Sequence, residues 1–498
     1  MNIRLRAIGA VSVLTLLTNL LGFAREILTA HALGTGPNAD AFVAAWSIVS
    51  ACFLVFSSIT IQAAFMPNYQ AARANSTSAS RGLFWHSFGW TAAASCVLIA
   101  VLDLGATSWV KLVLPGFTLE KTAETASLIR LLAPLMLFMT TGALLQSVSH
   151  AQRRFVAPAL VPTLNNVVII GLLILLVPKA GVRGLALAFV IGGSFWWWLL
   201  GCTLRDELFG ETRRPSGETL RSLVVQGLPV MFLLLADQIS ALIQKTLVSG
   251  LPTGSIASLS YAAKLVGVPT GIFAVAIATV FFPALTAALQ ERDFTLLAKR
   301  FRAGLAGVAL VSVPASVILI WAAEPLTRWI FERGAFDARA THMTANALVY
   351  YAFGLVPQGM IVYFNRTYYA AKNTRTPMWA GLISVVFSIV ACVIGVKFMG
   401  YLGIALGTTI YAFAYAALLA VGLRGNVQIG FDVVLQALWR ITFAGVLMYV
   451  ALYSIEPITL PAFVGGSLTA TAVYLVAGWL MREPLIRDAM LALRSFKH

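Results

Sequence analysis

The chain alternates between long apolar runs and short polar or Pro/Gly-rich joints, and this alternation constrains its fold more than any other feature. The runs 167–177 (VVIIGLLILLV) and 185–201 (LALAFVIGGSFWWWLLG) are typical. A bilayer core about 30 Å thick needs about 20 consecutive apolar residues per helix, whereas a barrel strand would alternate polar and apolar residues. Because neither run alternates, and because irregular backbone cannot face lipid, the runs predict membrane-spanning helices. A hydrophobic content of 59% with only 11% charged residues agrees.

Cutting the chain at its charged or Pro/Gly-rich joints predicts fourteen spans. In chain order they cover 8–33, 39–66, 83–110, 126–148, 157–178, 182–203, 223–248, 256–286, 303–323, 343–370, 377–398, 401–423, 437–455 and 461–481. The first span follows only MNIRLRA and has no small-residue cleavage site after it, so we interpret it as a retained helix and not a signal peptide. The predicted fold class is an all-α integral membrane protein.

Lysine and arginine are distributed unevenly over the joints. If the N-terminus lies in the cytoplasm, 22 of the 35 basic residues fall on the inner side and 8 on the outer side. This asymmetry predicts that both chain ends are cytoplasmic. The net charge of +16 would suggest a nucleic-acid partner in a soluble protein. Here it is explained by topology and by affinity for an anionic leaflet, so we expect no nucleic acid as a partner.

The cysteines and histidines exclude several classes of protein. The four cysteines lie singly in apolar spans, and the five histidines are scattered without metal-ligand spacing. The chain also lacks HExxH, GxxxxGK[ST] and GxSxG motifs. We therefore expect no metal site of this kind, no bound cofactor and no enzymatic activity.

The chain contains an internal repeat. GVRGLALA (181–188) recurs as GYLGIALG (400–407) at an offset of 219, which also relates Phe117 to Phe336, and Pro67 and Pro283 are related by an offset of 216. Six spans precede the charged segment 204–221 and six follow it, which predicts two parallel lobes about an axis along the membrane normal, an architecture typical of transporters. Chance similarity between Gly/Ala-rich helices is the alternative. The predicted division is 1–203 for the N-lobe, 204–221 for a cytoplasmic linker, 222–424 for the C-lobe, and 425–498 for two further helices with a basic tail.

Five segments resemble a known family. In chain order they are LLGFARE with GTGPNADAF (20–42), APALVPTLNN (157–166), YAAKLVGVPTGIFAVAIATVFFPALT (261–286), FERGAFD (331–337) and NRTYYAAKNTRTP (365–377). Together they resemble the MurJ/MviN group of the multidrug/oligosaccharidyl-lipid/polysaccharide exporter superfamily. The resemblance implies a flippase in the bacterial cytoplasmic membrane. Such proteins move undecaprenyl-diphosphate-linked sugars, above all the peptidoglycan precursor lipid II, from the inner to the outer leaflet.

Charged residues within the spans are the candidates for the substrate site. An arginine at mid-bilayer costs about 2.5–3.5 kcal/mol to insert, so Arg25 is expected to bind the substrate diphosphate, and Lys264 is the second candidate. Lys264 stands where the family usually has an arginine, so its binding should be less directional. On a helix Glu26 points about 100° away from Arg25. Glu26, Asn19 and Asp40 are expected to line the cavity or to take part in gating. Asp40 is expected either to cap the second helix or to pair with the first.

Two departures from the family pattern bear on the substrate. Asn19 stands where a first-helix arginine is expected, and the second span lacks the family's arginine. We therefore expect an exopolysaccharide-type repeat unit as the substrate, with lipid II as the alternative. A small-molecule antiporter of the multidrug type and a non-transporting scaffold of a glycan-synthesis complex are the rival classes.

The remaining polar candidates have two interpretations each. Asp237 either belongs to an incomplete sodium site or pairs with Lys245 or Lys264. Asn165 and its neighbour Asn166 join helices by hydrogen bonds or line the cavity. Arg366 either anchors a helix at the cytoplasmic surface or captures the headgroup.

The outer segment 331–337 and the last two spans also have expected roles. The segment either gates the outer mouth or lies on lipid headgroups, and the last two spans are expected to form a groove for the lipid tail. No nucleotide-binding motif is present, so we expect transport to be driven by the membrane potential or by a gradient of H⁺ or Na⁺. A glycan polymerase or synthesis complex is a candidate partner.

Overall fold

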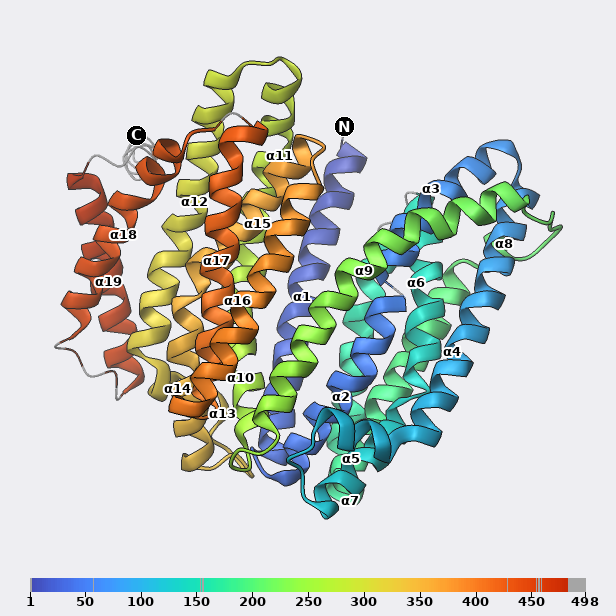
Figure 1. Cartoon of the computed structure of the whole chain (residues 1–498), viewed down its shortest axis with the longest axis horizontal. Coiled ribbons are helices and arrows are strands. Elements are labelled where there is room, and N and C mark those ends of the chain that lie inside the picture. Colours follow the sequence, from blue (N-terminus) through green and yellow to red (C-terminus); the bar gives the residue numbers. More distant parts are fainter. Residues whose placement is uncertain are drawn as a thin grey trace. The chain divides into compact units, whose positions relative to one another are not determined.

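The computed structural model describes residues 2–56, 58–152, 154, 156–427, 429–453, 455, 457 and 459–481. All regular secondary structure in this described part is helical (Figure 1). Large apolar side chains lie on the outside of the helices, and Leu104 and Phe398 are 86% and 84% exposed. Such a surface is stable in lipid because the backbone polar groups are satisfied within each helix. The predicted all-α integral membrane fold is confirmed.

The helices form two compact units, each described here by itself. The first comprises the residues up to Ala257 together with the short segment Arg333–Asp337, and the second comprises Ser258–Glu332 and the residues from Ala338 onward. The division into two six-helix lobes around a linker at 204–221 stays a prediction.

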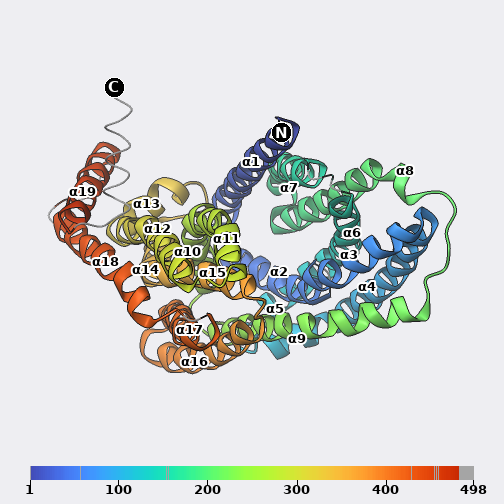
Figure 2. The ribbon, with the colours of Figure 1, turned by 90° about the horizontal axis from the view of Figure 1, so that it is seen from above.

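The first unit is built from nine helices and the beginning of a tenth. They are α1 (Asn2–Leu33), α2 (Pro37–Phe56), α3 (Ser58–Asn75), α4 (Thr77–Val113), α5 (Leu119–Leu132), α6 (Leu135–Ala151), α7 (Val156–Thr203), α8 (Arg205–Leu208), α9 (Gly217–Val248) and the first turn of α10 (Ser255–Pro269). Within the unit α1 packs against α7, α2 packs against α5, and α9 runs along α2 and α3 (Figure 2). These contacts bring the charged stretch of α1 next to the asparagines of α7.

The second unit continues from α10 to the last helix. Its elements are the rest of α10, the π-helical turn η1 (Thr270–Ala274), α11 (Val275–Gln290), α12 (Phe294–Trp321), α13 (Ala323–Phe331), α14 (Ala338–Phe353), α15 (Leu355–Ala370), α16 (Arg375–Met399), α17 (Leu402–Val427), α18 (Phe431–Tyr453) and α19 (Leu460–Leu480). Here α16 packs against α17, and α12 packs against α15 and α18. In the core of the unit, Phe301 of α12 stacks on Phe364 of α15 with ring centroids 5.8 Å apart.

The number of membrane spans agrees with the sequence only approximately. Eleven helices of the described chain are long and apolar enough to cross a membrane, or twelve if α14 and α15, which meet at a 45° bend, form one span. One of the eleven, α7, has 48 residues, about 72 Å at 1.5 Å per residue and more than twice the bilayer core. The predicted total of fourteen stays a prediction.

A sharp turn divides α7 at the joint between the predicted spans 157–178 and 182–203. Gly181 has φ 56° and ψ −136°, a conformation that a residue with a Cβ rarely adopts. Gly400, which ends α16 at the corresponding point of the repeat, has φ 58° and ψ −136°. The repeat predicted from the sequence therefore extends to the backbone geometry of this turn.

The helices on either side of each turn approach closely at a second glycine. A Cβ on Gly184 would lie 2.5 Å from the carbonyl oxygen of Leu176, and a Cβ on Gly403 would overlap the backbone of Gly395. Leu176 and Gly395 are again related by the offset of the repeat. Both hairpins therefore need a glycine at this position because the two backbones leave no room for a side chain.

Candidate functional site

Arg25 lies on α1 with three different contacts around its guanidinium. Its Nη1 donates to Oδ1 of Asn166 at 3.2 Å, and its Nη2 donates to Oε1 of Glu26 at 3.3 Å. The guanidinium carbon lies 4.8 Å from the ring centroid of Phe189, within the range of a cation–π contact. The side chain is 19% exposed, and its buried Nε has no hydrogen-bond partner among the described residues. The cation is therefore held in place with part of its donor capacity unused.

Asn166 fixes the position of this guanidinium. Its Nδ2 donates to the carbonyl oxygen of Thr18 at 3.1 Å, so its Oδ1 is turned toward Arg25. One turn earlier on α7, Thr163 and Thr18 share a hydrogen bond of 2.6 Å between their hydroxyls. Buried polar groups are stable when they are paired in this way, and the pairs join α1 to α7. The neighbouring Asn165 has a buried Oδ1 with no partner in the described part of the chain.

The contact between Arg25 and Glu26 corrects an expectation from helical geometry. Adjacent side chains leave a helix about 100° apart. Both side chains are long enough to bend toward each other, and they form an ion pair at 3.3 Å with exposures of 19% and 18%. A single carboxylate at this distance compensates the charge of Arg25, and a ligand with stronger negative charge can compete for the guanidinium.

The other two candidate cations, Lys264 and Arg366, belong to the second unit. Lys264 is exposed on α10 in the second unit, and its role as a second cation for the diphosphate stays a prediction. Arg366 is exposed on α15, with its guanidinium carbon 5.9 Å from the ring centroid of Phe282. Asn19 is exposed on α1. Its amide is compatible with a cavity-lining role, which also stays a prediction.

Asp40 neither caps α2 nor pairs with α1, contrary to both expectations. Its carboxylate is 2% exposed and accepts a hydrogen bond from Nζ of Lys121 on α5 at 2.7 Å. It also accepts the backbone N–H groups of Gly254 at 2.8 Å and Ala257 at 2.9 Å, so it caps the first turn of α10. These partners of Asp40 could not be predicted from the sequence, because they lie far away along the chain and no local pattern connects them to Asp40. Asp40 therefore joins three helices at the end predicted to face outward.

Asp237 on α9 does not form the predicted ion pair. Its side chain is exposed, and no described lysine or arginine lies within ion-pair distance of it. The described residues contain no group of three or more His, Cys, Asp or Glu that could hold a metal ion. Coupling to sodium or protons stays a prediction.

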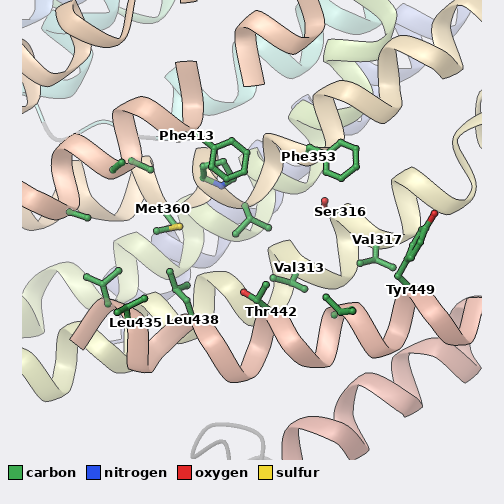
Figure 3. Close-up of a pocket in the computed structure, with 18 of the residues that line it drawn as sticks. Val313, Ser316, Val317, Phe353, Met360, Phe413, Leu435, Leu438, Thr442 and Tyr449 are labelled. Atoms are coloured by element: carbon green, nitrogen blue, oxygen red, sulfur yellow. The ribbon is translucent and has the colours of Figure 1, made fainter. Parts of the chain in front are cut away.

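An apolar cavity of about 640 Å³ lies in the second unit between α12, α15, α17 and α18 (Figure 3). Val313, Met360, Phe413 and Leu438 line it, each from a different one of these helices. The last two spans were expected to form a groove, but α18 lines this cavity together with α12, α14, α15 and α17, and α19 contributes no lining residue. The cavity can accept a flexible hydrocarbon chain because nearly all of its lining side chains are apolar.

A cluster of ionic contacts holds the segment after α7 against α3 and α4. Glu207 accepts a hydrogen bond from Arg73 at 2.9 Å and lies 3.6 Å from Arg154. Arg81 donates to the backbone carbonyls of Asp206 and Glu207. The hydrogen bond and charge of Glu207 raise the pKa of Arg73. The segment predicted as a cytoplasmic linker is thus anchored at its beginning to the first unit.

The comparisons with known proteins agree with this fold. The family model described as lipid II flippase MurJ matches residues 29–475. The lipid II flippase MurJ of Burkholderia cenocepacia is 27% identical over 439 residues, which cover 84% of this chain and 83% of that protein. The probable lipid II flippase MurJ of Vibrio cholerae is 29% identical over 466 residues, covering 89% and 87%.

Two solved structures show the same helical architecture. A lipid II flippase MurJ in an inward closed conformation aligns with a TM-score of 0.83 at 23% identity, covering 96% of this chain and 99% of that chain. An inward-facing multidrug resistance MATE family transporter of the MOP superfamily aligns with a TM-score of 0.70 at 16% identity, covering 82% and 94%. The family model spans most of the chain, so the protein belongs to the MurJ family of membrane flippases, which transport lipid-linked substrates and are not enzymes.

Proposed function

We propose that this protein flips lipid II from the inner to the outer leaflet of the bacterial cytoplasmic membrane by alternating access, with both chain ends in the cytoplasm. The observation that carries the proposal is the half-buried guanidinium of Arg25, which has one carboxylate partner and unused donors. A diphosphate cannot cross hydrocarbon unaided because burying unpaired charge is very costly. The planar fork of an arginine matches phosphate oxygens and supplies the missing partner.

The exchange of partners at Arg25 is the central step of the proposed mechanism. Before the headgroup binds, Glu26 compensates the charge of Arg25, and the incoming diphosphate displaces that carboxylate. Asn166 keeps the guanidinium oriented during the exchange because its own amide is tied to α1. Once the headgroup leaves, Glu26 pairs with Arg25 again. The charge of Arg25 is thereby compensated in both states, and the headgroup binds reversibly.

The isoprenoid tail has a separate site in this proposal. The apolar cavity between α12, α15, α17 and α18 suits a hydrocarbon chain, while the headgroup would remain with Arg25. We therefore assign the tail to this cavity, all of whose lining residues belong to the second unit. Separating the two parts lets a polar cavity carry only the headgroup.

Lipid II is favoured over an exopolysaccharide unit as the substrate. The missing first-helix arginine at Asn19 supported the exopolysaccharide, but the relatives reported above carry lipid II in their names at 27–29% identity across most of the chain.

The membrane potential can contribute to the driving force for flipping. A potential of 100 mV, negative inside, favours outward movement of an anion by about 2.3 kcal/mol per elementary charge.

The test is leaflet exchange in liposomes with purified protein. Lipid II is compared with an undecaprenyl-diphosphate that carries a different glycan, for wild type, Arg25→Ala and Arg25→Lys. Loss of a charge-assisted contact of about 1.5–3 kcal/mol corresponds to roughly a ten- to hundredfold slower exchange for Arg25→Ala. Arg302→Ala is the control, because that half-buried arginine donates to the exposed Gln436 in the second unit and lies outside the proposed site.

Each outcome of this test has a distinct meaning. Flipping of lipid II that is lost in Arg25→Ala and retained in Arg302→Ala supports the proposal. Flipping of the other glycan alone would restore the exopolysaccharide substrate. Equal flipping by Arg25→Ala and wild type would remove Arg25 from the site, and no flipping of either lipid would reject the proposed substrates altogether.

A further inference from the structure

A group of three aromatic side chains connects Arg25 to α2. The guanidinium carbon of Arg25 lies 4.8 Å from the ring centroid of Phe189 on α7. The same ring contacts Phe42 of α2, with centroids 5.6 Å apart, and Trp46 of α2, with centroids 5.1 Å apart in an edge-to-face arrangement. Such pairs are favourable because the positive edge of one ring meets the negative face of the other. The group therefore joins α1, α7 and α2 within the first unit.

Trp46 is the accessible member of this aromatic group. Phe42 and Phe189 are 6% and 8% exposed, so protein covers their rings, whereas Trp46 is half-buried. No described residue accepts a hydrogen bond from the indole N–H of Trp46, and this nitrogen is not fully buried. An indole N–H inside a protein usually has a partner. The open part of the ring and its N–H can therefore both contact a ligand.

Trp46 belongs to a face of α2 that also carries hydroxyl groups. Val43, Trp46, Ser47 and Ser50 are half-buried, and their spacing of three or four residues places them on the same side of the helix. The hydroxyls of Ser47 and Ser50 donate to the carbonyl oxygens of Val43 and Ser47 in the same helix. Their oxygens keep lone pairs for donors from a ligand. This face of α2 is therefore both aromatic and polar.

The same face differs from the lipid-facing surfaces of the protein. No large apolar side chain in the described part of α2 is exposed, whereas α4 and α16 expose several, such as Leu104 and Phe398. Hydroxyl groups gain nothing from hydrocarbon, which offers them no hydrogen-bond partner. The sequence of α2 also contains no lysine or arginine. Its contribution to a headgroup site is therefore an aromatic ring with hydroxyls, and not a cation.

The distance between Arg25 and Trp46 fits one sugar next to a phosphate. Because both contact the Phe189 ring, the Trp46 centroid lies no farther than about 10 Å from the guanidinium carbon. A phosphate bound to the guanidinium and the pyranose ring bonded to that phosphate together span a distance of this order. A pyranose presents C–H groups that pack on aromatic rings, while well-placed polar groups bind its hydroxyls.

We propose that Trp46, Ser47 and Ser50 form the subsite for the sugar that is bonded directly to the lipid diphosphate. The inference rests on the proposed function and names the part of the substrate that is recognised besides its charge. The sugar ring packs on the indole of Trp46, and its hydroxyls bind the indole N–H and the two serines. Phe189 contacts both Arg25 and Trp46, so it holds the two parts of the site side by side.

The subsite has a consequence for the choice between lipids. A lipid diphosphate that carries a glycan binds to both Arg25 and Trp46, whereas the bare lipid diphosphate that remains after the glycan has been transferred binds to Arg25 alone. The protein therefore favours the loaded carrier over the bare carrier.

Calorimetry in detergent with two soluble ligands tests the subsite. One ligand is a short-chain prenyl diphosphate, and the other is the same diphosphate carrying one N-acetylhexosamine. The variants are Trp46→Ala, Trp46→Phe and Ser47→Ala combined with Ser50→Ala. Trp90→Ala is the matched control, because Trp90 is 70% exposed on α4 and its indole N–H donates to His86 of the same helix.

We expect the wild type to bind the sugar-bearing ligand about three- to tenfold more tightly than the bare diphosphate, as one aromatic contact allows. Trp46→Ala should weaken binding of the sugar-bearing ligand by that factor and so remove the preference. The double serine variant should reduce the preference, and Trp46→Phe and Trp90→Ala should retain it. A merely structural role of Trp46 would weaken both ligands equally and leave the preference intact, which would overturn the subsite.

Two assays separate this inference from the proposed function. Arg25→Ala should weaken both ligands together, because both contain the diphosphate. If the wild type shows no preference for the sugar-bearing ligand, or binds neither ligand, the subsite is overturned even where lipid II is exchanged between leaflets. Absence of lipid II exchange in liposomes overturns the proposed function, whereas a preference lost only in Trp46→Ala still supports a sugar subsite beside Arg25.

Discussion

Replacing Asp40 by asparagine should destabilise the protein more than any change at an exposed ion pair. The Asp40 carboxylate is 2% exposed and its partner Lys121 is 12% exposed. The N–H groups of Gly254, just before α10, and of Ala257, in its first turn, also donate to this carboxylate. Removing one member of a buried ion pair costs about 3–5 kcal/mol, because the remaining charge stays buried without its partner. The neutral amide also loses the favourable interaction of a carboxylate with a helix N-terminus, worth up to about 2 kcal/mol in partly buried sites. Because an amide can still accept some of these hydrogen bonds, we expect a loss of about 3–5 kcal/mol in total for Asp40→Asn.

The assay is the half-life of folded protein in detergent at a fixed elevated temperature, since unfolding of a protein of this kind is often irreversible. Glu124→Gln is the matched control, because Glu124 pairs with Arg183 at a similar distance of 2.9 Å but with exposures of 25% and 59%. Such exposed pairs contribute at most about 1 kcal/mol. Lys121→Met and the double variant complete a cycle that measures the coupling directly.

Two results would refute this reasoning. A half-life for Asp40→Asn no shorter than that for Glu124→Gln would mean that the carboxylate does not stabilise the junction of α2, α5 and α10. Strictly additive effects of Asp40→Asn and Lys121→Met would mean that the two residues do not interact.

Three further predictions test the hairpin, the groove and the second cation. Gly184→Ala should shorten the half-life in detergent, because the new Cβ would lie 2.5 Å from a backbone carbonyl oxygen. Gly171→Ala, whose Cβ would meet nothing within 4 Å, should instead stabilise α7 by up to about 1 kcal/mol. A change of the half-life in the same direction for both variants would contradict this. Thr442→Trp should fill the apolar cavity and slow exchange of a full-length isoprenoid substrate more than that of a short-chain analogue. Leu447→Trp, on the same helix but outside the cavity lining, should not slow the full-length substrate selectively. Equal slowing of both substrates by Thr442→Trp would argue against a tail site. Lys264→Arg restores the bidentate fork and should tighten binding of a soluble diphosphate several-fold by calorimetry, and unchanged affinity would remove Lys264 from the diphosphate site.

Much of the architecture was predictable because the bilayer imposes strict requirements on the sequence. Long apolar runs without alternation can only be helices in lipid. Gly181 and Gly400 stand at corresponding places of the repeat in the sequence, and their backbone dihedral angles match. The exact number of spans was less predictable. Bends such as that between α14 and α15 depend on packing and leave little trace in hydropathy.

The candidate site was only partly predictable, and its partners were the least predictable part. The sequence by itself determined that the chain is a helical membrane protein, that it contains a repeat, and that Arg25 is costly unless it has a partner, because these follow from composition, periodicity and the cost of charge in lipid. Only the tertiary structure decided that Glu26 bends onto Arg25, that Asp40 caps α10 beside Lys121, and that the side chain of Asp237 is exposed. Ion pairs and caps join side chains that are distant along the chain, and their formation depends on how helices pack, which no local pattern encodes.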